Sequence, residues 1–259
     1  MAKFDAAAVA RLERIYGAPE IAAQRQRARE LIRARPGERG LENGCGPGFL
    51  ACELAREVGP DGTIVAIDSS ADMIAATQRR AHDQDLAGRI EAVTGDAKRL
   101  DFADGSFEFL VGVQVYLFVK EIEVALTEAA RVLRPGGRLL IVDTDWDSCV
   151  WLTADRERNR RVLDARSREF AQPHLPPLLP GLLRRAGLQL STVHAHPVLN
   201  LGYDPDSFSA GIIDAVAKSA INQGLNHAEA QAWAADLKGR TGEGEYFFSV
   251  NRYLFLARK

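Results

Sequence analysis

The sequence predicts an α/β fold: a doubly wound, mostly parallel sheet of seven strands with an inserted helical lid. Three observations predict it. Five strand-like segments, most of them separated by helical stretches, fall within about a hundred residues and end at position 142. These segments are mostly apolar runs, which is typical of parallel strands covered on both faces. Two further strand-like segments, 188–199 and 246–256, lie in a second half of the chain that has less of this alternation.

Hydrophobic spacing and turn residues place each element along the chain. The predicted strands are, in order, a short one ending at residues 41–42, then 63–67, 90–93, 107–113, 138–142, 188–199 and 246–256. The predicted helices are 5–34 with a break near 17–19, 49–58, one capped by Ser69 or Ser70, 122–133, 147–171, 180–186, and 205–238 with a break near 224–226. An Arg-Pro-Gly-Gly run at 134–137 stops one helix, and the proline-rich run 173–177 is a rigid interruption.

Composition excludes several classes of protein. The 259 residues carry 33 Lys and Arg against 35 Asp and Glu, so the chain is not a nucleic-acid-coating protein. No apolar run approaches the roughly 20 residues of a membrane span, so we expect no membrane partner. The three cysteines have unrelated spacings that fit neither a disulfide framework nor a zinc site. We therefore expect no metal and a cytoplasmic, reducing compartment.

Residues 42–48, Glu-Asn-Gly-Cys-Gly-Pro-Gly, form the most informative motif. Glycines permit a sharp turn and a close approach to a ligand, and the helix that follows directs its free N–H groups to the same place. Asp68 ends the second strand, where a carboxylate can accept hydrogen bonds from both hydroxyls of a ribose. Asp96 follows the third strand, where it can accept from the amine of an adenine. Each residue has a structural alternative, a plain turn or a helix cap, but together they indicate a nucleoside-containing ligand.

Four segments give the chain a family resemblance. They are 42–48, then Ala-Ile-Asp-Ser-Ser-Ala-Asp-Met at 66–73, Gly-Asp-Ala at 95–97, and Arg-Val-Leu-Arg-Pro-Gly-Gly-Arg at 131–138. In this order and spacing, over about residues 35–145, the chain resembles the class I S-adenosylmethionine-dependent methyltransferases. It is most similar to the small-molecule branch of ubiquinone/menaquinone C-methyltransferases, the type 11-like group. The resemblance implies a Rossmann-like fold, S-adenosylmethionine as cofactor and S-adenosylhomocysteine as product.

The resemblance also implies a role for individual residues. Glu42 and the backbone of the glycine-rich turn would hold the amino-acid end of the cofactor, and Asp68 would hold its ribose. Asp96 would contact the adenine, and Gln114 would lie near the sulfonium. The full implied cofactor-binding set is Tyr16, Arg25, Glu42, Gly44, Cys45, Gly46, Asp68, Ser69, Met73, Asp96, Ala97 and Gln114.

By the same resemblance the chain divides into three parts. An N-terminal helical cap covers 1–34, and the S-adenosylmethionine-binding core covers 35–145. The remainder, 146–259, supplies the last strands of the sheet and the inserted helices that cover the acceptor. The partner would be a small-molecule methyl acceptor, and the chain would act as a monomer or homodimer.

Two residues depart from the family pattern. Gly40 lies inside the first strand, and Asn43 replaces the apolar residue that usually follows the acid. Because glycine loses order and packing inside a strand, we expect a locally loosened first strand and weaker cofactor affinity, without loss of the site.

Methyl transfer from a sulfonium is an in-line displacement, so the protein must mainly align the acceptor and exclude water. An acceptor that loses a proton also needs a base. The candidates are Asp145 after the fifth strand, Tyr116 after the fourth, and His174 in the proline-rich run. Capping and core packing are the structural alternatives for them.

Three other functions are considered. A dinucleotide-dependent oxidoreductase, binding NAD(P), would share the glycine-rich turn, but Phe49 stands where its fingerprint needs a third glycine. Tyr116 and Lys120 match the Tyr-x-x-x-Lys spacing of short-chain dehydrogenases, although here they follow the fourth strand. A cofactor-binding protein without transfer activity keeps the same acids. For methylation of tRNA or protein, balanced charge disfavours RNA, and the predicted helices around 147–171 and 205–238 suit a lid over a small molecule better than an open groove.

Overall fold

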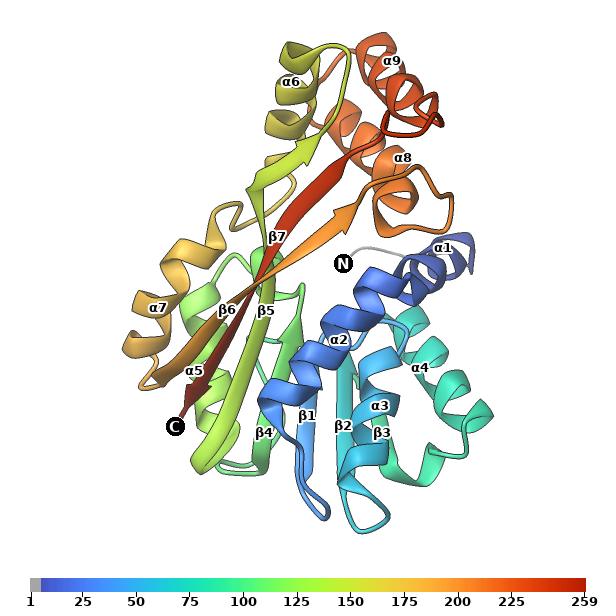
Figure 1. Ribbon diagram of the computed structural model, residues 1–259. Coiled ribbons are helices and arrows are strands. Elements are labelled where there is room, and N and C mark those ends of the chain that lie inside the picture. The colour runs from blue at the N-terminus through green and yellow to red at the C-terminus, as the bar shows by residue number, and fades with distance from the viewer. Residues whose placement is uncertain (1–5) are drawn as a thin grey trace.

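The computed structural model describes residues 6–259, which form one seven-stranded sheet with α-helices on both faces (Figure 1). The strands are β1 (Arg39–Asn43), β2 (Thr63–Asp68), β3 (Ile90–Thr94), β4 (Phe107–Val113), β5 (Leu133–Trp151), β6 (Gln189–Asn200) and β7 (Phe248–Arg258). The α-helices are α1 (Ala6–Gly17), α2 (Pro19–Ile32), α3 (Phe49–Val58), α4 (Ala71–Asp83), α5 (Ile122–Val132), α6 (Arg156–Ser167), α7 (Leu175–Arg185), α8 (Phe208–Asn222) and α9 (His227–Lys238).

The strand order is β3-β2-β1-β4-β5-β7-β6. Strands β1 to β5 are parallel, whereas β7 runs antiparallel to both β5 and β6. The chain therefore winds outward from β1 in both directions, and the carboxyl ends of the parallel strands meet at one edge. The predicted doubly wound, mostly parallel sheet of seven strands is confirmed.

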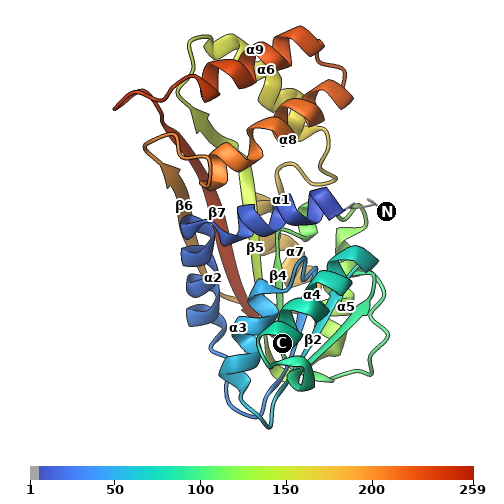
Figure 2. The ribbon, with the colours of Figure 1, turned by 90° about the vertical axis from the view of Figure 1, so that its right-hand side faces the viewer.

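Apolar side chains cover both faces of the sheet. On one face the core includes Leu126 of α5 and Leu179 of α7. On the other it includes Ile32 of α2 and Leu54 of α3 (Figure 2). Burial on both faces is the reason that the inner strands read as continuous apolar runs. Within the described residues, no helix is both long and apolar enough to cross a membrane.

A third core lies beyond the carboxyl edge, where β5, β6 and β7 extend past the other strands and carry α6, α8 and α9 (Figure 1). The ring centre of Trp151 lies 5.2 Å from that of Trp233 of α9, edge to face, and 4.6 Å from that of Phe248, with the rings tilted. Ile15 of α1 belongs to the same core. The N-terminal helix and the second half of the chain therefore pack together over the edge where a ligand of this fold would bind.

Several element boundaries differ from prediction. Strand β5 continues to Trp151, so residues 147–151 are strand rather than helix, and α6 begins only at Arg156. The extra length exists because β5 pairs with β7 as far as Trp151 and Phe248, with an irregularity between Asp145 and Val150. Helix α7 begins at Leu175, inside the proline-rich run. Prolines in a first turn are tolerated there because those N–H groups have no partner within the helix.

The expected loosening of the first strand is wrong. Strand β1 pairs along its whole length with β2 and over four residues with β4. Position 40 requires glycine, because a Cβ atom there would lie 2.1 Å from Cζ of the buried Phe109 ring. Glycine lets that ring lie directly against the strand, so it improves packing rather than weakening it.

Candidate active site

The glycine-rich turn joins β1 to α3 in a conformation that needs glycine. Gly44 and Gly48 have φ angles of 72° and 79°, and a Cβ on Gly48 would lie 2.8 Å from the Thr77 side chain. The N–H groups of Gly44 and Cys45 donate to the carbonyl of Ile67 at 2.8 and 2.9 Å. The turn is thus fixed to the end of β2, next to Asp68.

Asp68 connects this turn to the next helix. Its Oδ2 accepts from the N–H of Gly46 at 3.0 Å, and its Oδ1 accepts from the N–H of Ser70 at 2.9 Å. Burial raises the pKa of the Asp68 carboxyl, and the hydrogen bonds from Ser70 and Gly46 oppose this. Ser70 is the residue that caps α4, since its Oγ accepts from the N–H of Met73 at 3.4 Å. Asp68 is therefore not needed as the cap, and Ser69 lies between the two.

A small cavity of about 40 Å³ opens between α2 and the turn. Six of the predicted cofactor-binding residues line it: Tyr16, Arg25, Glu42, Gly44, Cys45 and Gly46. The structure thus brings together side chains from α1, α2 and β1 at the carboxyl edge of the sheet. Gln24 and Arg252 line the same cavity and were not predicted.

Three residues that line this cavity, one acidic, one basic and one neutral, have buried polar atoms without partners among the described residues. These atoms are Oε2 of Glu42, Nε2 of Gln24 and Nε of Arg252. Burial raises the pKa of the Glu42 carboxyl well above its usual range, with Glu53 and Asp68 adding to the effect. Unpaired buried polar groups are costly, so a ligand that pairs with them gains affinity.

Arg252 enters the site from β7, far along the chain. Its side chain is 3% exposed, donates to Oε1 of Gln24, and lies 4.7 Å from the ring centre of Phe208. Burial lowers the pKa of its guanidinium to about 10. The one sequence signal for it is an arginine within an otherwise largely apolar closing strand.

Arg25, unlike Arg252, has a carboxylate partner among the described residues. Its Nε pairs with Oε1 of Glu53 at 2.9 Å, its Nη1 donates to the Tyr16 carbonyl, and its guanidinium lies 4.8 Å from the Phe49 ring centre. Its charge is therefore balanced within the protein. Between the two arginines that line this cavity, Arg252 is the one with a donor that has no partner in the described part of the chain.

The adenine-side residues lie farther along the same edge. Met73 is buried against Val9 of α1, and Ala97, in the loop after β3, is buried in the core that includes α5 and α7. Asp96 is exposed, and its Oδ1 accepts from the N–H of Lys98 at 2.9 Å.

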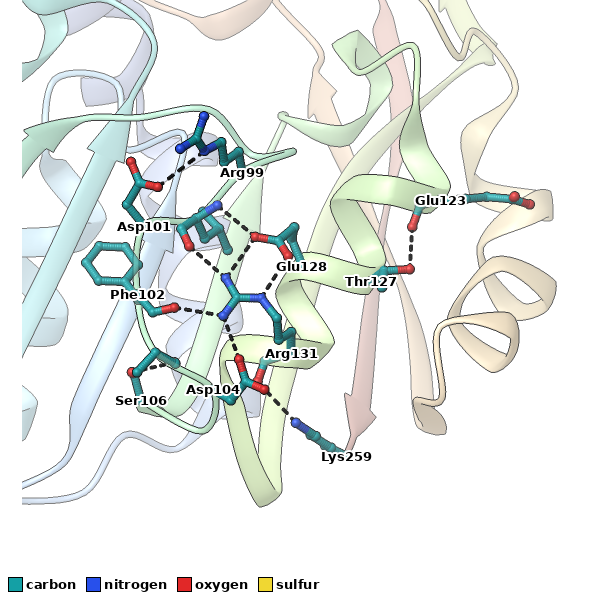
Figure 3. Close-up of polar contacts among 12 residues, drawn as sticks. Arg99, Asp101, Phe102, Asp104, Ser106, Glu123, Thr127, Glu128, Arg131 and Lys259 are labelled. Carbon is teal, nitrogen blue, oxygen red and sulfur yellow. Dashed lines mark hydrogen bonds and ion pairs between the residues drawn. The ribbon is translucent and has the colours of Figure 1, made fainter.

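Arg131, from the fourth resemblance segment, holds that loop in place (Figure 3). Its guanidinium donates to the carbonyls of Leu100 and Phe102, each at 2.7 Å, and to Oδ1 of Asp104 at 2.8 Å. Glu128 pairs with Arg131 and accepts from the N–H of Leu100 at 2.9 Å. Helix α5 thereby fixes the loop that carries Asp96.

Gln114 has a strained backbone, with φ at 57° for a residue that is not glycine. Its side-chain oxygen accepts from Thr144 Oγ1 at 2.6 Å, and its N–H donates to the Val142 carbonyl at 2.8 Å. These bonds stabilise the conformation at the junction of β4 and β5. Such outliers cluster at functional sites, so the geometry supports a role for Gln114.

The three predicted catalytic residues have different surroundings. Asp145 is partly buried on β5, and burial raises its carboxyl pKa. His174 is exposed, with Nδ1 2.6 Å from Oδ2 of Asp147. Tyr116 is enclosed by the core, and its hydroxyl, which is buried, has no partner among the described residues.

An aromatic surface adjoins Asp145. The ring centres of Trp146 and Phe170 lie 5.5 Å apart in a stacked pair. The guanidinium of Arg166 lies 4.8 Å from the Phe170 ring centre and 5.5 Å from that of Trp146.

His194 and His196 lie on the α2-facing side of β6. In the ladder between β6 and β7 they are directly opposite Leu254 and Arg252.

Comparison with known proteins identifies the segment that holds most of these groups. Residues 41–141 match a family model described as a methyltransferase domain. The resemblance to class I S-adenosylmethionine-dependent methyltransferases is confirmed. All four resemblance segments lie within the matched residues, and the match ends inside β5.

Two curated relatives show how far the similarity extends. An uncharacterised 37.1 kDa protein in transposon TN4556 of Streptomyces fradiae is 40% identical over 131 residues, 51% of this chain and 37% of that protein. The ubiquinone/menaquinone biosynthesis C-methyltransferase UbiE of Pseudomonas putida is 38% identical over 114 residues, 44% of each chain. The matches thus span less than half the length of these relatives.

Solved structures share the fold over almost the whole chain. A candidate methyltransferase from Bacillus halodurans superposes with a TM-score of 0.66 at 18% identity, covering 92% of this chain and 99% of the other. The [4+2]-cyclase SpnF gives 0.61 at 20% identity, covering 92% and 81%. At these identities the likeness shows the fold alone.

Proposed function

We propose that the protein is an S-adenosylmethionine-dependent methyltransferase that acts on a small-molecule acceptor. The observation that carries this is the cavity beside the glycine-rich turn. Glu42, Gln24 and Arg252 line it, and each has a buried polar atom without a partner among the described residues. A carboxylate and a guanidinium in one small cavity fit the ammonium and carboxylate of an α-amino acid. A dinucleotide has no such end, so this pairing favours S-adenosylmethionine over NAD(P).

The other residues complete the proposed cofactor site. The backbone of Gly44, Cys45 and Gly46 would approach the amino-acid end, with Tyr16 and Arg25 closing over it from the N-terminal helices. The remaining contacts would come from Asp68 and Ser69 at the end of β2 toward the ribose, from Met73 of α4 with Asp96 and Ala97 after β3 toward the adenine, and from Gln114 after β4 toward the sulfonium.

When bound, the cofactor supplies a methyl group already attached to a good leaving group. The protein must then position the acceptor and keep water away. We propose that α6, α8 and α9 with α1 form the cover, because their shared core lies over the carboxyl edge. Asp145 would act as the base for an acceptor that loses a proton, with His174 and Asp147 beside it. Tyr116, which the core encloses, would support the ends of the strands from within the protein.

Titration calorimetry tests the cofactor assignment. We expect micromolar binding of S-adenosylmethionine and S-adenosylhomocysteine, and none of NADH at the same concentrations. Binding of NADH alone would favour the alternative function, an NAD(P)-dependent oxidoreductase. Binding of neither ligand class would refute the site.

Cofactor affinity should also depend on pH through Glu42. Because burial raises its pKa, the free folded protein keeps a proton on Glu42 at a pH where an exposed glutamate has ionised. The folded state thus binds this proton more tightly than the unfolded state, and the stability of the free protein falls as pH rises through this range. The cofactor ammonium requires the ionised form, so binding releases a proton.

We therefore expect the Kd for S-adenosylhomocysteine to fall as pH rises through the range in which Glu42 ionises, above that of an exposed glutamate, and Glu42→Gln to flatten that dependence. Calorimetry in two buffers with different ionisation enthalpies measures the released proton. An unchanged pH slope in Glu42→Gln would show that Glu42 does not face the ammonium.

A further inference from the structure

A second cavity, of about 310 Å³, lies at the other end of α2 from the proposed cofactor site. It is bounded by the last turn of α2, the segment that follows, and the facing sides of β5, β6 and β7. Gln24 and Arg25 line the cofactor cavity, whereas Ile32 and Arg33 line this one, roughly 12 Å further along the helix at 1.5 Å per residue. The nine lining residues are Leu31, Ile32, Arg33, Arg35, Arg138, Thr192, His194, Leu256 and Arg258.

The lining contains four arginines and a histidine but no acidic residue. Arg138 is ion-paired, with Nη2 at 2.5 Å from Oε2 of Glu38. Its side chain is only 9% exposed, yet its Nε has no hydrogen-bond partner among the described residues. A buried donor of a charged group without an acceptor is costly to maintain.

The other three arginines are not ion-paired within the described part of the chain. Arg33, Arg35 and Arg258 form no ion pair with a carboxylate there at the 4.0 Å limit. Arg138 and Arg258 are moreover directly opposite each other in the β5–β7 ladder. Like charges at directly opposite positions destabilise a sheet. The charges of Arg138 and Glu38 cancel each other, so about three positive charges, those of the other arginines, remain around the cavity.

We propose that this cavity binds a small polyanion carrying two or three negative charges on phosphoryl or carboxylate oxygens. Guanidinium groups match such oxygens in a two-point geometry, and the remaining charge requires more than one anionic group. Leu31, Ile32 and Leu256 supply an apolar wall for the carbon part of the ligand. The volume lies at the lower end of the roughly 300–1,000 Å³ range of small-molecule sites. The site is separate from the proposed cofactor cavity, since no residue lines both.

Calorimetric titration of the full chain tests this, with inorganic pyrophosphate as the phosphoryl probe and citrate as the carboxylate probe. At low salt we expect at least one of the two probes to bind at a single site. The probe that binds more tightly identifies the preferred oxyanion. The double variant Arg33→Gln with Arg258→Gln should bind that probe at least about tenfold more weakly, because two charge-assisted contacts are lost. Both side chains are exposed, so an unchanged melting temperature should confirm that the variant folds.

Arg184→Gln is the matched control. Arg184 is an exposed arginine on α7, which packs against the sheet but does not line the cavity. We expect this variant to bind the probe as the wild type does. The proposal is overturned if neither probe binds. It is also overturned if the double variant binds as tightly as the wild type, or if Arg184→Gln weakens binding as much as the double variant.

Discussion

Asp68→Ala is expected to weaken S-adenosylmethionine binding about a hundredfold. The substitution removes a carboxylate that lies at the end of β2 and already accepts from Gly46 and Ser70. Hydrogen bonds to a charged acceptor are each worth about 1.5–3 kcal/mol, and about 1.4 kcal/mol corresponds to a tenfold change in affinity. Calorimetry on wild type and variant measures the ratio of the two Kd values.

The control must separate loss of the ligand contact from loss of the turn. Asp72→Ala removes an exposed acid from the first turn of α4, four residues along the chain, and should leave the Kd nearly unchanged. Asp68→Asn retains an acceptor for one of the two N–H groups and should give an intermediate Kd. If Asp68→Ala folds and binds S-adenosylmethionine as wild type does, the ribose contact is refuted.

Gly40→Ala is expected to destabilise the protein by about 3 kcal/mol, at the upper end of the usual range for overpacking. The added Cβ would lie 2.1, 2.4 and 2.7 Å from three atoms of the Phe109 ring. That ring is fully buried, so it has little room to move. Denaturant unfolding of wild type and variant gives the difference in the free energy of unfolding.

Two further variants make the test specific. Gly88→Ala is the matched control, since a Cβ there meets nothing within 4 Å and the φ angle is ordinary, and it should be nearly neutral. In the double variant Gly40→Ala with Phe109→Leu, the smaller side chain relieves the clash, so the combined loss should be less than the sum of the single losses. Equal stability of Gly40→Ala and wild type would contradict this account of β1.

The parts of the fold that the sequence predicts well depend on local chemistry. The turn at 42–48, the break between α1 and α2, and the helix stop after Val132 are set by glycine and proline over a few residues. Apolar runs sufficed for the inner strands because these are buried on both faces. The site residues at the carboxyl ends of β1 and β2 are also predictable, because the shared direction of parallel strands places these ends together.

The parts that the sequence missed depend on distant partners. The end of β5 is strand because it pairs with β7, about a hundred residues later, and nothing in residues 147–151 signals this. Gly40 has its role through Phe109, which comes from another strand. Arg252 enters the cofactor cavity only because β7 returns between β5 and β6, which places it against Gln24 of α2.

Methyl transfer itself is the most direct test of the central claim. Wild-type protein and Asp68→Ala would each be incubated with methyl-labelled S-adenosylmethionine and a cell extract separated into small-molecule, RNA and protein fractions. We predict label in the small-molecule fraction with wild type, together with S-adenosylhomocysteine, and little with Asp68→Ala. Binding of S-adenosylmethionine without label in any fraction, or label confined to RNA or protein, would contradict the proposed function.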